Sequence, residues 1–359
     1  MCLDYIMSMK TFVVVAGYWS TNIGNSFFQL GAEFMLRQAF PKDRVVFLSD
    51  QPGYWDVNIG NPPNSLDYLA HIEMDYLVIQ GPYLRPEYPK IWLQTLRKLK
   101  ERGVKIIVLS AGMMDYSQKM QEQAREWLTE IPPYVFITRD TETYKFFGDL
   151  ATHAMDGVDV ATFVSDLHHP LSTTLPPYII FNFDQIPEPT VAIDNGTTLK
   201  ENEEVIQFNN LALKFRFASR ELNLARQYKF YLFLRSLLPM RPSLQESIAD
   251  HIIVRTDHRF NPMLLQKSYA APNSFTSDIP HTYLNLYANT EATFSNRVHA
   301  CVATLAYGKP AKLFSNSPRA YLLDRLGAVN IRKELIKIDT AWLKQEKSAM
   351  IDFLRQVVN

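Results

Sequence analysis

The sequence predicts an α/β protein with two doubly wound, Rossmann-like domains that face each other across a cleft. Two observations carry this prediction. Short, almost wholly apolar runs alternate with longer amphipathic runs, which is typical of parallel strands covered by helices on both faces. A polar stretch at residues 165–177, rich in His, Pro, Ser and Thr, interrupts this alternation, which then starts again. The 359 residues suffice for two domains of about 150 residues each, expected at 9–165 and 176–335.

In the first half, local patterns indicate each element in turn. Residues 11–16 form an apolar run that predicts a buried strand, and residues 23–40 repeat large apolar side chains near helical spacing. A helix over residues 89–102 is expected to end at Gly103, a common C-terminal signal. Further strands are expected at 44–48, 76–79, 105–109 and 134–138, and further helices at 118–130 and 141–147.

The second half repeats this order. Strands are expected at 178–183, 251–255, 292–295 and 311–314, and helices at 280–288, 298–307 and 321–326. Asn296 is a suitable N-cap for the helix at 298–307, and Gly308 marks its end. A terminal helix at residues 340–359 can pack back onto the first domain.

Composition excludes several classes of function. The 37 Lys and Arg balance 37 Asp and Glu, which argues against broad nucleic-acid binding. Cys2 and Cys301 alone cannot build a disulfide framework or a zinc finger, and HExxH, GxSxG and CxxC motifs are absent. The apolar run at residues 12–16 is too short for a signal peptide or a membrane span. We therefore expect a cytoplasmic protein, and none of these motifs indicates a metal or other cofactor.

The strongest candidate for chemistry follows the expected strand at 292–295. Ligands of parallel α/β sheets bind beyond the carboxyl ends of the strands, and Asn296, Arg297 and His299 lie at such an end. A guanidinium, an imidazole and the free N–H groups of a helix start suit a phosphate or a carboxylate. His299 can also transfer a proton near neutral pH. Alternatively, Arg297 caps a neighbouring carbonyl and His299 packs at a domain seam.

The loop after the first strand is a second candidate for substrate binding. Asn22, Gly24 and Asn25 can meet a phosphate or a sugar hydroxyl there, with Asn25 or Ser26 capping the next helix. The loop matches neither GxGxxG nor a Walker motif. The segment by itself favours a plain strand-to-helix turn.

Three further strand ends carry candidate substrate-binding residues. Arg139 can face the same cleft as Arg297 or form a surface pair with Asp140. Asp159 can orient a sugar hydroxyl or organise its turn. Arg319 can add positive charge to the cleft. The segment at residues 257–259 is interpreted as a loop salt cluster.

Residues 214–241 differ from the rest of the chain. They carry seven basic residues and one acidic residue, interleaved with aromatic and leucine side chains. Such a stretch, expected to be helical, can lie on an anionic membrane at its inner face. An internal helix with a solvated basic face is the alternative that we favour.

Several motifs together resemble those of the polysaccharide pyruvyl transferases. They are Asn-Ile-Gly-Asn at residues 22–25, Arg-Asp at 139–140, Gly-Val-Asp at 157–159 and Arg-Val-His-Ala at 297–300. The helix exit at residues 303–310, with its Gly-Lys-Pro ending, also matches the family. Asn25 stands where the family has an acidic residue.

The resemblance implies a glycosyltransferase-B-like fold and transfer of a pyruvyl group from phosphoenolpyruvate to a cell-surface polysaccharide or its lipid-linked precursor. The product is a pyruvate ketal that bridges two sugar hydroxyls, and phosphate is released. Arg297 then binds the donor, with Arg139 and Arg319 as further positive groups. His299 donates a proton or neutralises the departing phosphate. Two alternatives remain, a nucleotide-sugar-dependent glycosyltransferase and a non-catalytic glycan-binding relative.

Overall fold

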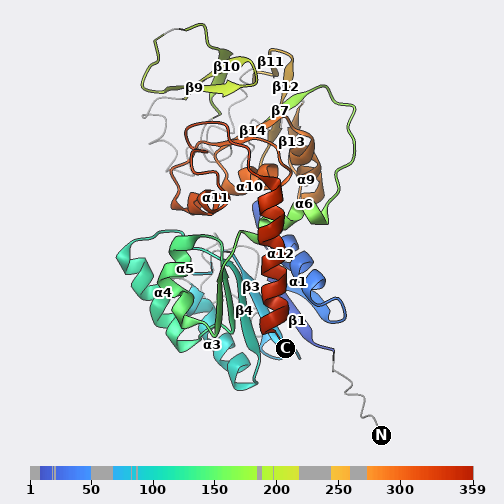
Figure 1. Cartoon of the computed structure of the whole chain (residues 1–359), viewed down its shortest axis with the longest axis vertical. Coiled ribbons are helices and arrows are strands. Elements are labelled where there is room, and N and C mark those ends of the chain that lie inside the picture. Colours follow the sequence, from blue (N-terminus) through green and yellow to red (C-terminus); the bar gives the residue numbers. More distant parts are fainter. Residues whose placement is uncertain are drawn as a thin grey trace, which may run out of the picture.

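The computed structural model (Figure 1) describes two α/β domains that lie one above the other along the long axis of the molecule. It describes residues 9–17, 19, 22–49, 68–81, 83–85, 88–183, 188–196, 198–217, 244–258 and 273–358, with the backbone alone at 88–91. Among the described helices, none is long and apolar enough to cross a membrane.

The first domain contains a six-stranded, wholly parallel sheet in the order β2-β1-β3-β4-β5-β6. Its strands are β1 (Thr11–Ala16), β2 (Arg44–Ser49), β3 (Tyr76–Gln80), β4 (Lys105–Ala111), β5 (Val135–Thr138) and β6 (His153–Asp156). Its helices are α1 (Gly24–Ala39), α3 (Tyr88–Glu101), α4 (Gln118–Glu130) and α5 (Thr141–Phe147). All five strands expected from the sequence are present.

Alternate side chains of each strand enter two separate cores. Phe12 and Val14 pack in the core that includes α1, whereas Val13 and Val15 pack in the core that includes α3 and α4. This period of two is why apolar residues fill the strands almost without interruption. The sheet is therefore covered on both faces.

The segment that connects the domains packs against α1. It contains the 3₁₀ helix η2 (Val160–Phe163) and the helix α6 (Val164–Leu167), whereas the 3₁₀ helix η1 (Gly148–Leu150) precedes β6 within the first domain. Gly31 of α1 contacts η2 so closely that a Cβ there would lie 1.9 Å from the carbonyl oxygen of Val160. Only a glycine permits this approach of backbone to backbone.

The second domain contains a six-stranded sheet in the order β11-β12-β7-β14-β15, with β13 beside β12. Its strands are β7 (Tyr178–Asn182), β11 (Ser247–Ile248), β12 (His251–Thr256), β13 (Ser274–Phe275), β14 (Ala292–Ser295) and β15 (Ala311–Leu313). All pairs are parallel except β11 with β12. The helical elements are α9 (Pro280–Asn289), α10 (Val298–Ala306), η5 (Pro318–Ala320) and α11 (Tyr321–Arg325).

A small antiparallel sheet, which the sequence analysis did not predict, lies in this domain. It consists of β8 (Thr190–Ile193), β9 (Glu203–Phe208) and β10 (Leu211–Arg216) in the order β8-β10-β9. Phe208 and Phe215 pack with Phe181 and Phe294 of the parallel sheet in one core. In the described residues, this sheet therefore packs against the parallel sheet where the sequence analysis expected helices.

The expectation of a helix over residues 214–241 is wrong at its start, because Lys214 to Arg216 end strand β10. Lys214 and Arg216 both pair with Glu203 of β9 across the ladder. Cross-strand pairing thus uses two of the basic side chains that suggested membrane contact. Residues 218–241 lie outside the described part of the chain.

The last helix, α12 (Thr340–Val357), runs beside α1 from the second domain to the first (Figure 1). Met350 and Leu354 are buried in the same core as α1. The Tyr134 hydroxyl donates to the Val357 carbonyl at 2.7 Å, and Arg355 donates to the Gln38 carbonyl at 2.7 Å. This core also holds side chains of α9 and α10, so a single apolar interior runs through both domains.

Candidate functional site

Charged residues from both domains meet at the carboxyl ends of their strands. Arg139 follows β5, Asp159 follows β6 and His299 lies in the first turn of α10 after β14. The Asp159 Oδ2 atom lies 3.3 Å from Arg139 Nη1 and 3.5 Å from His299 Nε2. The structure thus brings together three residues that the sequence analysis chose independently.

Asp159 is the carboxylate at the centre of this group, and it is fully buried. Its Oδ1 atom accepts the Ala161 N–H at 2.9 Å and caps η2. Burial alone would raise the pKa of Asp159, but His299, Arg139 and the Ala161 N–H together lower it to about 2. The side chain is therefore a permanent negative charge that orients an arginine and a histidine.

Arg139 is held in place by the backbone around it. Its N–H donates to the Ala111 carbonyl at 3.0 Å, and its guanidinium covers Gly112, where a Cβ would lie 2.3 Å from Nε. Ser110 has a φ of +55°, and its Oγ accepts the Val160 N–H at 2.6 Å. A buried, non-glycine residue in this region stores strain, which is frequent at functional sites.

The Nη2 atom of Arg139 takes no part in these contacts. Arg139 is 1% exposed, and its Nη2 atom has no hydrogen-bond partner among the described residues. A buried N–H that has lost its water costs free energy unless an acceptor replaces that water. The guanidinium is therefore prepared to donate to an anion.

His299 is buried beside Phe28, with 5.3 Å between the ring centres, and its Cβ faces the Cα of Gly24. Its Nε2 is within ion-pair distance of Asp159 but makes no aligned hydrogen bond in the described chain. Burial lowers the pKa of His299, and Arg319 and Arg139 lower it further against the opposing effect of Asp159. The imidazole is therefore neutral at pH 7 in the ligand-free protein.

Arg297 and Asn296 differ from the sequence expectation in detail. Helix α10 begins at Val298, so Arg297 and not Asn296 is the N-cap, and no side chain caps the helix. The Arg297 N–H donates to Ser295 Oγ at 2.8 Å, and this hydroxyl donates to Asn182 Oδ1 at 3.0 Å. Asn296 is 2% exposed, with its N–H on the Asn182 carbonyl at 3.0 Å. Ser295, and not Asn296, is therefore the side chain that bonds to the backbone just before α10.

Two more arginines complete the positive cluster. Arg319 lies on η5, after β15, and Arg85 follows β3. Burial lowers the pKa of Arg319, and the charges of Arg139, Arg85 and Arg297 lower it further. The four guanidinium groups therefore share one electrostatic environment.

The sequence analysis missed Arg85. The rule that found the other residues, a charged side chain shortly after a strand, applies to it as well.

Asn22, Gly24 and Asn25 lie at the seam between the domains. A Cβ at Gly24 would lie 3.2 Å from both His258 Nδ1 and His299 Cβ. Asn22 Nδ2 donates to Asn25 Oδ1 at 3.0 Å. Helix α1 begins at Gly24 with Ile23 as N-cap, so the expected capping by Asn25 or Ser26 is wrong. Gly24 is buried where α1 packs against the second domain, whereas Asn22 and Asn25 are partly exposed.

Asp140 and His258 have other partners than the sequence analysis expected. Asp140 caps α5 by accepting the Thr143 N–H at 2.7 Å, and it also accepts the Tyr116 hydroxyl at 2.8 Å. It forms no pair with Arg139, which contacts Asp159. His258 is 1% exposed and bonds to the Tyr287 hydroxyl at 2.6 Å, so it belongs to the domain seam and not to a loop salt cluster.

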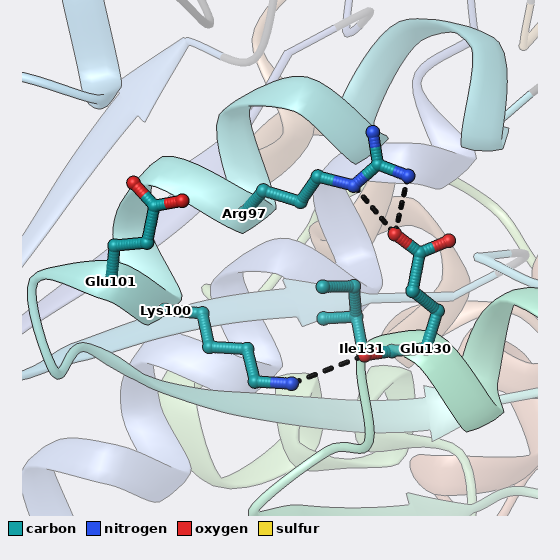
Figure 2. A pocket seen from close by; sticks show the side chains of 5 residues that line it. All are labelled: Arg97, Lys100, Glu101, Glu130 and Ile131. Carbon is teal, nitrogen blue, oxygen red and sulfur yellow. Dashed lines mark hydrogen bonds and ion pairs between the residues drawn. The ribbon is translucent and has the colours of Figure 1, made fainter.

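Surface hollows elsewhere on the first domain do not coincide with this cluster. Figure 2 shows one, lined by Arg97, Lys100, Glu101, Glu130 and Ile131 at the C-terminal ends of α3 and α4. Those helix ends lie at the amino edge of the sheet, opposite the strand ends that carry Arg139 and Asp159. Within the described chain, no three His, Cys, Asp or Glu side chains group as metal ligands do.

Comparison with solved structures supports the fold. A candidate UDP-N-acetylglucosamine 2-epimerase from Listeria monocytogenes is 9% identical, with 97% of this chain and 88% of that chain covered and a TM-score of 0.52. A UDP-N-acetylglucosamine 2-epimerase from Rickettsia bellii is 11% identical, with 96% and 88% covered and a TM-score of 0.49. Such low identity concerns the fold alone. The prediction of two doubly wound domains in a glycosyltransferase-B-like arrangement is confirmed.

Comparison with sequence families gives the assignment. No curated protein sequence matches this chain significantly. The profile of the polysaccharide pyruvyl transferases, however, matches residues 22–318, which is most of the chain and includes every candidate residue except Arg319. The chain therefore belongs to the polysaccharide pyruvyl transferase family.

Proposed function

We propose that this enzyme transfers the pyruvyl group of phosphoenolpyruvate to two hydroxyls of one sugar in a glycan, forming a ketal and releasing phosphate. The observation that carries the proposal is the group of four arginines, Arg139 beside the Asp159 carboxylate and Arg319 in the field of Arg85, Arg139 and Arg297. Arg85, Arg139 and Arg319 alone outnumber the Asp159 carboxylate. A small donor with both a phosphate and a carboxylate matches this excess of positive charge.

The chemistry needs a proton donor next to the anion site. Protonation of the methylene carbon of the donor makes its central carbon electrophilic, and the first sugar hydroxyl attacks it. The bond from this carbon to the phosphate oxygen then breaks, and the second hydroxyl forms the second C–O bond. Of the two hydroxyl protons, one balances the proton on the new methyl group and the other leaves on phosphate.

His299 is suited to carry these protons. It is neutral in the ligand-free site because burial and the arginines lower its pKa. A bound multivalent anion opposes the arginine charges and raises that pKa, so the imidazole gains a proton as the donor binds. His299 then gives this proton to the methylene carbon and recovers one from a sugar hydroxyl.

The decisive experiment measures phosphate release from phosphoenolpyruvate with a panel of p-nitrophenyl glycosides and with lipid-linked glycan extracts. We expect release that depends on the acceptor, together with a product heavier by one pyruvate ketal. Thermal stabilisation by phosphoenolpyruvate and not by UDP or GDP is expected. Stabilisation by a nucleotide diphosphate alone would instead support a nucleotide-sugar-dependent glycosyltransferase, and glycan binding without phosphate release would support a non-catalytic relative.

A further inference from the structure

Arg85 is a partly buried arginine whose side chain makes no hydrogen bond or ion pair with the described part of the chain. Its Nε atom is buried without a partner. A guanidinium has five N–H donors and is always charged, so burying one donor unpaired costs free energy. A side chain placed only for structure would be expected to find an acceptor.

The backbone around Arg85 holds it near the site. Gly81 leaves β3 with a φ of +74°, and a Cβ there would lie 3.1 Å from the ring of Phe28. The Phe28 ring is the one that packs 5.3 Å from His299. Tyr83, which is 1% exposed, anchors the segment in the core of the first domain. The segment that leads to Arg85 is therefore held by buried neighbours, one of which, Phe28, also packs against His299.

Arg319 approaches the same place from the second domain. It is also partly buried, its Nε atom is buried without a partner, and its side chain makes no hydrogen bond within the described residues. Arg85 is one of the charges that lower the pKa of Arg319. Two unpaired cations from opposite domains thus repel each other in the ligand-free protein, and an anion between them would remove that repulsion.

On the basis of the proposed function, we propose that Arg85 is a donor-binding residue and that Arg85 and Arg319 together hold the phosphate group of phosphoenolpyruvate between the domains. Arg139, which pairs with Asp159 beside His299, then binds the carboxylate group of phosphoenolpyruvate. The fork of N–H donors on each arginine suits the oxygens of a phosphate.

The test compares Arg85→Gln with Arg97→Gln in the full chain by calorimetric titration of inorganic phosphate and of pyruvate. Arg97 is a matched control, because it is an exposed arginine of the same domain that pairs with Glu130 (Figure 2). We expect Arg85→Gln to weaken phosphate binding by about 10-fold or more and pyruvate binding by less than about twofold. Arg97→Gln should change neither affinity, and Arg85→Lys should recover part of the loss.

Thermal unfolding separates a binding role from a structural one. Removing an unpaired cation should leave the Tm of the ligand-free protein unchanged or raise it, while the stabilisation by phosphate is lost. Unchanged phosphate affinity in Arg85→Gln, an equal loss for pyruvate, or a lower ligand-free Tm would each overturn the inference. Phosphate is the probe, so the role of Arg85 is tested even if phosphoenolpyruvate fails to bind, a result that would count against the proposed function alone.

Discussion

At the scale of single residues, His299 combines three properties that seldom occur together in a structural histidine. It is buried, it faces an ionised carboxylate, and its Nε2 atom has no aligned hydrogen bond within the described chain. A histidine that merely filled space would be expected to satisfy both ring nitrogens. The arrangement of His299 therefore supports the proposed exchange of a proton with a ligand.

Replacing His299 with glutamine tests that function. We expect kcat to fall by about 100-fold or more, as for the loss of a general acid, with little change in the affinity for phosphoenolpyruvate. The measurement is steady-state phosphate release together with calorimetric binding. His153→Gln is the control, because His153 lies on β6 against Tyr134, outside the cluster. Full turnover by the His299 variant would refute the proton-transfer role.

Donor binding itself should take up a proton. The pKa of His299 is lowered in the ligand-free site and rises when an anion opposes the arginines. Calorimetry in two buffers of different ionisation enthalpy should therefore show proton uptake near pH 7, and affinity should increase as the pH falls from 8 toward 6. Both effects should disappear in His299→Gln. Pure proton release on binding in the wild type would contradict this account.

Asp159 connects the same site to stability. Its folded-state pKa of about 2 lies below the value near 3.9 of an unfolded chain. A depressed pKa means that its stabilising contribution is present above about pH 4 and is lost as the pH falls toward 2. Asp159→Asn should destabilise the protein by about 3 kcal/mol at pH 7, because Arg139 loses its buried partner. Urea unfolding should show this difference shrinking below pH 4, and a difference independent of pH would argue against the ion pair.

At the scale of elements, the contact between α1 and η2 sets the position of Asp159, which caps η2. A Cβ at residue 31 would lie 1.9 Å from the Val160 carbonyl oxygen, so Gly31→Ala must displace one element from the other. We expect a loss of about 1–3 kcal/mol in the free energy of unfolding, with lower activity.

Gly24→Ala is the comparison for this prediction. Its Cβ would meet side chains at 3.2 Å, which can give way more easily than backbone. It should therefore cost less stability while still disturbing His299. Denaturant unfolding of both variants checks the order, and equal stability of Gly31→Ala and the wild type would disprove the close contact.

Most parallel strands were predictable because they are short apolar runs, but β6 (His153–Asp156) and β13 (Ser274–Phe275), which are short and partly polar, were not predicted. The charged residues after the strands followed from the rule that sites lie at strand ends. The antiparallel sheet was not predicted. Only residues 206–208 of β9 and 213–216 of β10 alternate apolar and polar side chains. The turn between these two strands contains two asparagines, of which Asn209 adopts a φ of +52°, and such a pair is a turn signal in the sequence. The cap of α10 was misassigned because it depends on Ser295 and Asn182, which are far apart in the sequence. The tyrosine partners of Asp140 and His258, Tyr116 and Tyr287, likewise come from other segments, although the Thr143 N–H that Asp140 caps lies only three residues away.

At the scale of the whole molecule, the site exists only when both domains are in contact. Asp159 and Arg139 come from the first domain, and His299 and Arg319 come from the second. The two domains also share one apolar core through α1, α10 and α12. The relative position of the charged groups of the site is therefore fixed by the same packing that stabilises the fold.

Helix α12 has a consequence for how the protein is made. Its buried residues complete the face of the sheet to which β1 contributes, although they are translated after the whole of the second domain. The first domain therefore cannot complete its core until the entire second domain has been translated. Until then its sheet stays partly uncovered, and the growing chain needs protection from aggregation for longer than its early position would suggest.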